Sequence, residues 1–251
     1  MRKVNFMTND NVRVYGILNN NNSDTCVIMC HGIRSGREEH GNFTKLVEEL
    51  NKYKIDNFRF DFRGHGESKE DFLKMDIVGA IKDLEATMEY INDLKYEKII
   101  LLGASFGAGI ISLIDYNKYK NISNLILWYP CIVYENTDIF SKKNVEKSID
   151  DGYFETKSMR TGKVFRFSKE FMTQTLKYKP IENLKGNKIS KLFIHGDLDI
   201  NTLYEDTKRC ANESVNSRLI TIKTGTHGFF DNKEHFEKAM SETIEYIRGI
   251  V

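Results

Sequence analysis

Strand-like and helix-like stretches alternate along almost the whole chain, and this alternation limits the fold more than any other feature. The stretches between the strands carry apolar residues at helical spacing. The runs with strand character are residues 4–8, 12–18, 26–30, 55–62, 98–103, 125–129, 191–195 and 218–223. The pattern predicts an α/β fold with a mostly parallel, eight-stranded sheet that helices cover on both faces.

The rhythm breaks once, between the sixth and seventh strand-like runs. Residues 131–187 are rich in aromatic and charged side chains, show no clear period and are far longer than a usual connection. We interpret this segment as a lid inserted into a single domain that spans residues 1–251, a length within the range of one large α/β domain. The turn at residues 9–11 also predicts that the first two strands pair antiparallel.

Charge and hydropathy exclude several classes of partner. Lysine plus arginine number 37 and aspartate plus glutamate 36, so no long-range field recruits nucleic acid. The first ten residues lack the apolar run of a signal peptide, which favours a cytoplasmic protein. Residues 125–134 form the most apolar later run, and they are about half of the roughly 20 residues that a membrane-spanning helix needs. We expect no membrane span.

One glycine-flanked serine lies where a strand gives way to a helix. The motif Gly103-Ala-Ser-Phe-Gly107 follows the fifth strand-like run and precedes a helical stretch at residues 108–116. In a nucleophile elbow the serine backbone is strained, and small residues two positions away avoid a clash. The turn exposes the hydroxyl and places the N–H of Phe106 at a helix N-terminus, where it can face an oxyanion. The motif predicts that Ser105 is a nucleophile.

A serine hydroxyl needs a neighbouring base to take its proton. His227 follows the last strand-like run and precedes the final helical stretch at residues 233–247, so its loop would lie over the same end of the sheet. We therefore predict that His227 is the base. The other histidines are expected to shape turns, to make polar contacts or to lie at the surface: His31, His40, His65, His195 and His235.

The imidazole in turn needs a carboxylate that holds its tautomer. Asp199 lies two residues past the seventh strand-like run, and the chain order serine, acid, histidine is a known one for such sheets. We favour Asp199. Asp197 stays open as an alternative, because one residue separates the two and each could point toward the histidine. Asp138, after the sixth strand, is a third candidate.

His31-Gly-Ile33 ends the first central strand, where a loop can contribute a second backbone N–H to an oxyanion hole. We assign that second amide to Ile33, beside the first at Phe106.

At this point the chain resembles the α/β-hydrolases, and most of all compact intracellular carboxylesterases of the feruloyl (cinnamoyl) esterase type. The resemblance covers nearly the whole chain and depends on motifs that occur in the family's order: His31-Gly-Ile33, Asp61-Phe-Arg-Gly-His-Gly-Glu-Ser68, Gly103-Ala-Ser-Phe-Gly107, His195-Gly-Asp-Leu-Asp199 and Gly225-Thr-His-Gly228.

The resemblance implies a role for each motif. The acid carries over to Asp199, the base to His227 and the oxyanion amides to Ile33 and Phe106. The second motif is structural in such relatives, so Asp61 and His65 receive no catalytic role. The chain departs from the family after the acid, where Asn201-Thr-Leu203 lacks the proline of many relatives, and at Phe106, where relatives often have glutamine or methionine.

Aromatic side chains in the predicted lid offer a surface for an acyl or aryl group. Among them we select Tyr134, Phe165 and Phe167 as candidate substrate-binding residues. A basic cluster at Lys157, Arg160, Lys163 and Arg166 could attract a carboxylated substrate or an acyl group on an acidic carrier. The chain has no metal-ligand spacing and no glycine-rich nucleotide motif, so we expect neither a metal nor a cofactor.

The sequence thus predicts a serine hydrolase that cleaves a small-molecule carboxylic ester through an acyl-enzyme intermediate. Three alternatives remain open at this stage: an acyl thioesterase or acyltransferase, a peptidase, and a non-catalytic ligand-binding module with the same fold.

Overall fold

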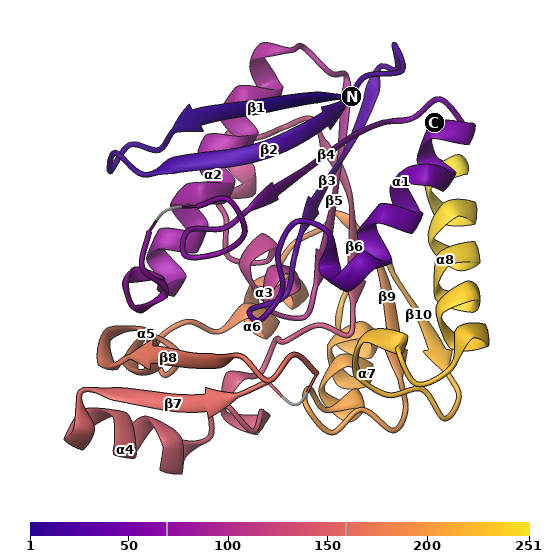
Figure 1. Ribbon diagram of the computed structural model, residues 1–251. Helices are drawn as coiled ribbons and strands as arrows, with labels where there is room; N and C mark the ends of the chain where they lie inside the picture. Colours follow the sequence, from indigo (N-terminus) through magenta and orange to yellow (C-terminus); the bar gives the residue numbers. More distant parts are fainter. Residues whose placement is uncertain (69, 159) are drawn as a thin grey trace.

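The computed structural model, which describes residues 1–68, 70–158 and 160–251, has the predicted α/β architecture. Eight strands form one sheet in the order β1-β2-β4-β3-β5-β6-β9-β10 (Figure 1). β1 and β2 pair antiparallel and β2 is antiparallel to β4, whereas the later neighbours are parallel. The strands are β1 (Arg2–Met7), β2 (Arg13–Asn19), β3 (Thr25–Cys30), β4 (Asp56–Asp61), β5 (Lys98–Ala104), β6 (Ile122–Trp128), β9 (Ser190–Gly196) and β10 (Ser217–Ile222).

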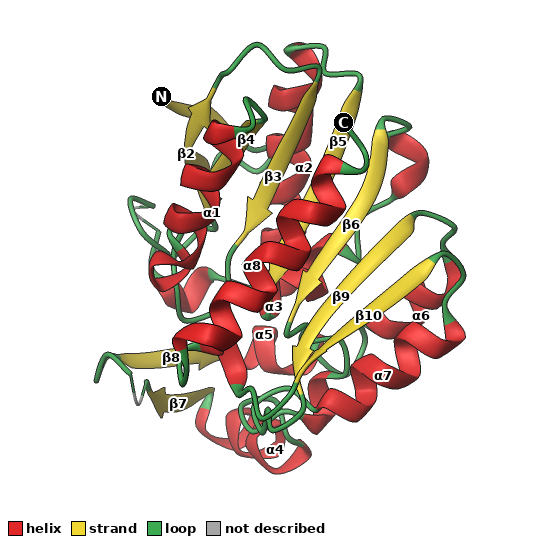
Figure 2. Ribbon diagram, turned by 90° about the vertical axis from the view of Figure 1, so that its right-hand side faces the viewer, coloured by secondary structure: helices red, strands yellow, loops and turns green. Residues whose placement is uncertain are grey.

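The central strands of this sheet are buried on both sides. Helices cover both of its faces, as in other mostly parallel sheets. Helices α1 (Asn42–Lys52) and α8 (Lys233–Arg248) lie on one face, seen in front of the sheet in Figure 2. The other face carries α2 (Ile77–Asp93), α3 (Phe106–Ile111), α6 (Pro180–Gly186) and α7 (Tyr204–Glu213). Short 3₁₀ helices span Glu39–Gly41, Phe72–Lys74, Tyr116–Lys118, Tyr134–Asn136 and His227–Phe229.

The segment at residues 131–187, described except for residue 159, contains regular helices and strands although its sequence shows no clear period. It contains α4 (Lys142–Asp151), an antiparallel hairpin of β7 (Tyr153–Lys157) and β8 (Val164–Ser168), and α5 (Lys169–Gln174) before α6. The hairpin and α4 lie beyond the end of the sheet to which the arrows of β3, β5, β6 and β9 point (Figure 1). Its position at the carboxyl ends of the strands puts this segment beside the candidate site.

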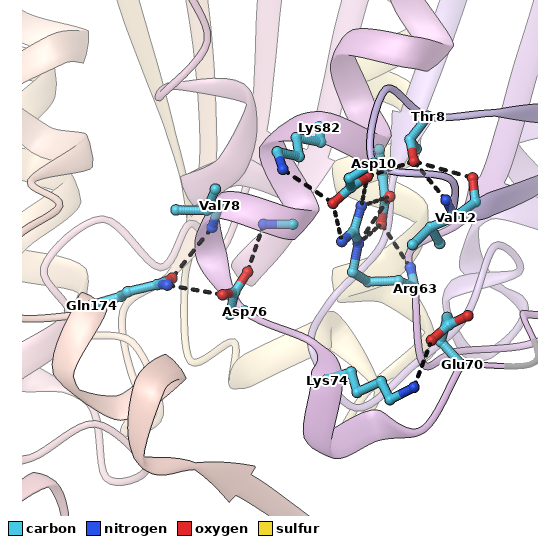
Figure 3. A network of polar contacts seen from close by, with 12 residues as sticks. Thr8, Asp10, Val12, Arg63, Glu70, Lys74, Asp76, Val78, Lys82 and Gln174 are labelled. Carbon is cyan, nitrogen blue, oxygen red and sulfur yellow. Dashed lines mark hydrogen bonds and ion pairs between the residues drawn. The ribbon is translucent and has the colours of Figure 1, made fainter.

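Aromatic rings and one amide side chain attach this segment to the rest of the domain. The Phe72 ring lies 5.1 Å from that of Phe165 and 5.2 Å from that of Phe167 between centroids. The side chain of Gln174 accepts hydrogen bonds from the backbone N–H groups of Ile77 (2.8 Å) and Val78 (3.2 Å). It also donates to Asp76 at 2.9 Å (Figure 3). The contacts join the segment to the first turn of α2.

A buried ion-pair network fixes the loop after β4. The Arg63 guanidinium contacts Asp83 at 2.8 Å and Asp10 at 3.0 Å, and Lys82 also reaches Asp10 (Figure 3). The side chain of Asp83 is fully buried. In the same motif, Asp61 accepts a hydrogen bond from the backbone N–H of Arg37 at 2.8 Å. These contacts give the motif after β4 a structural role, and none of them requires the motif to take part in catalysis.

Arg63→Leu is expected to lower the free energy of unfolding by about 3–5 kcal/mol, because it leaves the Asp83 carboxylate buried without its partner. Lys118→Ala is the control, since it removes an exposed ion pair with Glu85 and should cost less than about 1 kcal/mol. Urea unfolding of both variants measures the difference. Equal losses would contradict the role given to the Arg63 network.

Within the described residues, no helix combines the length and the apolar character that crossing a bilayer requires.

Candidate active site

Ser105 occupies a sharp turn between β5 and α3, with φ 51° and ψ −116°. A side chain at Gly103 would place its Cβ 2.5 Å from the Ala108 backbone, and one at Gly107 would place it 2.1 Å from the Cys30 carbonyl oxygen. No real Cβ fits at such distances, so both positions need glycine. Because β5 is central and β3 is its neighbour, the turn holds Ser105 at the carboxyl end of the sheet.

Three side chains from distant parts of the chain meet at this turn. His227 Nε2 lies 3.1 Å from Ser105 Oγ. On the other side of the ring, His227 Nδ1 lies 2.7 Å from Asp199 Oδ2. With Nδ1 donating to the carboxylate, Nε2 is left as the acceptor for the serine proton. The arrangement is the one that a serine nucleophile, a general base and an orienting acid require.

The Asp199 carboxylate is buried and receives hydrogen bonds at both oxygens. Oδ1 accepts the backbone N–H groups of Asn201 (2.8 Å) and Thr202 (3.1 Å). Oδ2 accepts His195 Nε2 at 3.0 Å, the Thr202 hydroxyl at 3.1 Å and His227. Burial alone would raise the pKa of Asp199, but the neighbouring His227 and the hydrogen bonds from both histidines hold that pKa well below its usual range. Asp199 is therefore ionised at neutral pH.

The two other candidate acids lie elsewhere. Asp197 accepts the Thr224 backbone N–H at 2.6 Å and pairs with Lys223 at 3.1 Å, on the outer side of the loop. Asp138 is exposed and lies on the lining of the cavity beside Ser105. The structure brings Asp199, and neither of these two, to His227.

Ile33, in the loop after β3, and Phe106, the first residue of α3, both line this cavity. Within the part of the chain that the structure describes, neither amide has a hydrogen-bond acceptor. Two buried histidines hold the Ile33 loop: His31 Nδ1 donates to the Gly32 carbonyl at 2.8 Å, and His65 Nε2 donates to the Ile33 carbonyl at 2.6 Å. Both amides are thus available to a ligand oxygen.

Glu39 is a buried carboxylate in the same cavity, and no motif in the sequence singled it out. It accepts the Gly32 backbone N–H at 2.7 Å and the Tyr129 hydroxyl at 3.2 Å. The Tyr129 ring in turn lies 4.8 Å from that of His227. Glu39 has a positive φ of 42°, a strained conformation that tends to occur at functional sites. Its hydrogen bonds connect the Ile33 loop with the surroundings of His227.

Burial raises the pKa of Glu39, despite opposing hydrogen bonds from Gly32 and Ser35. A carboxyl whose pKa is raised on folding binds more protons in the folded state, so its contribution to stability falls as pH rises through the folded pKa. Glu39→Gln removes this titration and keeps an acceptor for the Gly32 N–H. We expect the variant to gain stability relative to the unmodified protein between pH 4.5 and pH 8. Urea unfolding at both pH values tests this, and a difference that does not change with pH would contradict it.

Two further partners of the Asp199 carboxylate could not be identified from the sequence. Thr202 contacts Asp199 through its backbone and its hydroxyl, and His195 Nδ1 lies 2.8 Å from the Thr207 hydroxyl while its Nε2 faces Asp199. The position of His195 at a strand end predicted a polar contact, but not its partner. Nothing in the sequence predicts the contact of Thr202 with Asp199, since Thr202 lies in the stretch that departs from related sequences.

A cavity of about 400 Å³ opens beside Ser105 Oγ. Apolar side chains form part of its wall, among them Phe106, Ile139 and Phe140. The described lining does not include Tyr134, Phe165 or Phe167, the three aromatics selected as substrate-binding residues. All three rings are at most 4% exposed and pack into the core, so their part in substrate binding stays a prediction. Phe140, which packs against Tyr134 and Phe167, reaches the cavity in their place.

Among residues 1–68, 70–158 and 160–251, no three histidine, cysteine or acidic side chains come together as a metal site requires.

The sequence model of a family described as serine aminopeptidase, S33, matches residues 21–147, slightly more than half of the chain. No curated protein sequence matches the chain.

Solved structures similar to this chain include several esterases. Est1E from Butyrivibrio proteoclasticus with ferulic acid bound has a TM-score of 0.83 at 20% identity, covering 98% of each chain. The esterase Pf2001 from Pyrococcus furiosus has a TM-score of 0.75 at 21% identity, covering 98% of this chain and 89% of its own. A monoacylglycerol lipase from Paleococcus ferrophilus has a TM-score of 0.76 at 18% identity, covering 93% and 97%. At these identities the likeness establishes the α/β-hydrolase fold.

Proposed function

Since the chain belongs to the serine aminopeptidase S33 family of α/β-hydrolases, we propose that it is a serine hydrolase that cleaves carboxylic esters through an acyl-enzyme intermediate. One observation carries this proposal: the hydrogen-bonded series Ser105–His227–Asp199 lies beside two backbone amides with no acceptor in the described residues. Such a series activates a serine for attack on an acyl carbon, and the amides suit the oxygen that becomes negative.

The first half-reaction transfers the acyl group to the enzyme. Ser105 Oγ attacks the ester carbonyl carbon while His227 Nε2 takes the hydroxyl proton, and Asp199 stabilises the imidazolium that forms. The N–H groups of Ile33 and Phe106 donate to the tetrahedral oxyanion. The bond from carbon to the alcohol oxygen then breaks, and the leaving oxygen takes the proton from His227.

Water completes the cycle. It attacks the acyl carbon while His227 Nε2 accepts one of its protons, and collapse of the second tetrahedral intermediate returns the proton to Ser105 Oγ. The products are a carboxylic acid and the regenerated serine. No other group is needed to balance either step.

The cavity favours an ester over the substrate of an aminopeptidase, which carries a cationic amino terminus. Arg34 and Arg160 line the cavity, and of its two carboxylates Glu39 is already hydrogen-bonded within the protein. A cationic group would therefore meet like charge. The structural neighbours Est1E, Pf2001 and the monoacylglycerol lipase agree with an ester substrate.

An acyl thioesterase is the second candidate, since Arg160 of the basic hairpin lines the cavity, Lys163 lines the hollow beside it, and both could attract an acidic acyl carrier. Purified protein is therefore assayed with p-nitrophenyl esters, acyl-coenzyme A thioesters and aminoacyl p-nitroanilides of matched chain length. We expect the highest kcat/KM with the oxygen esters. A higher kcat/KM with the thioesters or the anilides would replace the ester hydrolase proposal. The proposal would be refuted if no substrate were turned over and a fluorophosphonate did not label Ser105.

A further inference from the structure

Positive charge gathers on one side of the cavity that holds Ser105. Arg34, His40 and Arg160 all line this cavity. Arg34 directly follows Ile33, so its Cα is about 3.8 Å from that of the residue with the second oxyanion amide. Arg160 comes from the turn of the β7–β8 hairpin. Two distant parts of the chain thus bring guanidinium groups to one space beside the nucleophile.

Arg34 is half-buried, and in the described part of the chain its guanidinium makes no hydrogen bond or ion pair. Burial lowers its pKa, and only the nearby Asp138 carboxylate acts in the opposite direction. Partial desolvation of a cation without a close partner is costly, and a bound anion relieves that cost. The side chain is therefore poised for a negatively charged ligand.

Arg160 is held by an aromatic ring. Its guanidinium carbon lies 3.6 Å from the centroid of Phe230, and the ring of His40 meets the same phenyl ring at 5.7 Å. Stacking uses the flat face of the guanidinium and leaves its N–H donors, which lie in the plane, free to bind an oxyanion. The ring fixes where the charge sits without neutralising it.

Two arginines and two carboxylates line the cavity. Glu39 is buried and hydrogen-bonded by Gly32 and Tyr129, and Asp138 is exposed. Burial together with Arg160 and Arg34 lowers the pKa of His40, which favours its neutral form. Because the charges of the lining balance, a ligand with a single negative charge disturbs this balance less than a phosphate monoester with its double charge.

We propose that the natural ester carries a free carboxylate a few bonds from its scissile bond, and that Arg34 and Arg160 bind this carboxylate. This inference rests on the proposed ester hydrolysis and names the substrate class for it. The carboxylate can belong to the acyl part or to the alcohol part, and both place the same chemistry in the cavity.

Two matched substrate pairs separate the sources of the charge. Monoethyl adipate and ethyl hexanoate differ by a carboxylate on the acyl side, and 4-acetoxybenzoate and methyl 4-acetoxybenzoate differ by one on the alcohol side. The readout is the ratio of kcat/KM for the charged member to that for the neutral member, which cancels any general change in activity. We expect a ratio of about tenfold or more for at least one pair at low salt, and a fall at high salt.

Arg34→Gln should lower that ratio and the double variant with Arg160→Gln should bring it to about one, whereas Arg34→Lys should retain most of it. Lys143→Gln is the matched control, because it removes one exposed positive charge from α4 of the same segment, outside the lining of the cavity. It should leave the ratio unchanged within about twofold, since exposed charges are screened over such distances.

The outcomes distinguish this inference from the function on which it rests. If both pairs give ratios near one while neutral esters are hydrolysed in a Ser105-dependent way, the carboxylate inference is wrong and the ester hydrolase proposal stands. A preference that is unchanged in Arg34→Gln, or that Lys143→Gln lowers equally, also overturns it. Absence of turnover for all four esters, with no labelling of Ser105, rejects both proposals.

Discussion

Ser105→Ala is expected to lower kcat/KM for ester hydrolysis by about 10⁴-fold or more. The substitution removes the only atom that forms the acyl bond in the proposed mechanism, while the amides of Ile33 and Phe106 remain. Residual turnover then comes from binding and oxyanion stabilisation alone. The backbone should keep its conformation, because the Ser105 N–H donates to the Trp128 carbonyl at 2.9 Å whichever side chain is present.

Initial rates with a p-nitrophenyl ester measure the loss, and a fluorophosphonate should label the unmodified protein but not the variant. Ser112→Ala is the matched control: it deletes the same hydroxyl at the end of α3, where that hydroxyl donates to the Gly109 carbonyl away from the described cavity lining. We expect the control to retain activity within about threefold. A Ser105→Ala enzyme that keeps more than about a tenth of its activity would show that another group is the nucleophile.

Asp199→Asn is expected to lower kcat by about 10³-fold to 10⁴-fold, with little change in the fold. The direction follows from the surroundings of the carboxylate. The backbone N–H groups of Asn201 and Thr202 need an acceptor at the Oδ1 position, so the amide oxygen of the asparagine should turn toward them. Its NH₂ group then faces His227 Nδ1, which must accept that hydrogen bond. His227 Nε2 therefore carries a proton already and cannot take the one from Ser105.

Asp197→Asn makes the same chemical change two residues earlier and serves as the control. Asp197 faces Lys223 and the Thr224 N–H on the outside of the loop, so we expect kcat to change by less than about threefold. Steady-state kinetics of the two variants decide between the acids. A larger loss in Asp197→Asn would assign the role to Asp197 and would mean that this loop has a different conformation during catalysis.

The arrangement of the sheet was predictable because its strands are continuous apolar runs between amphipathic helices. Parallel strands bring their carboxyl ends to one edge, and this is why residues 105, 199 and 227 could be expected to meet there. The choice between Asp197 and Asp199 could not be made from spacing. The choice depends on which carboxylate accepts the hydrogen bonds of the Asn201 and Thr202 backbone N–H groups, and local turn geometry determines this.

Other elements escaped prediction for lack of apolar content. Helix α7 is highly charged and buries only Asp206, Thr207, Cys210 and Ala211, so its period is weak. Strand β8 alternates buried and exposed side chains over only five residues, too few to distinguish it from a loop. Aromatic residues serve binding and packing equally, and only the tertiary contacts show that Phe165 and Phe167 pack into the core.

The attachment of the segment at residues 131–187 has a consequence for how fast the enzyme can exchange ligands with solvent. Swinging this segment away would expose Phe165, Phe167 and Phe171, each at most 4% exposed, at about 1.5–3 kcal/mol per ring. It would also break the hydrogen bonds of Gln174 to α2. Wide hinge opening is thus rare on the time scale of turnover. We therefore expect ligands to exchange while this segment stays in place, so solvent viscosity should barely affect the turnover number.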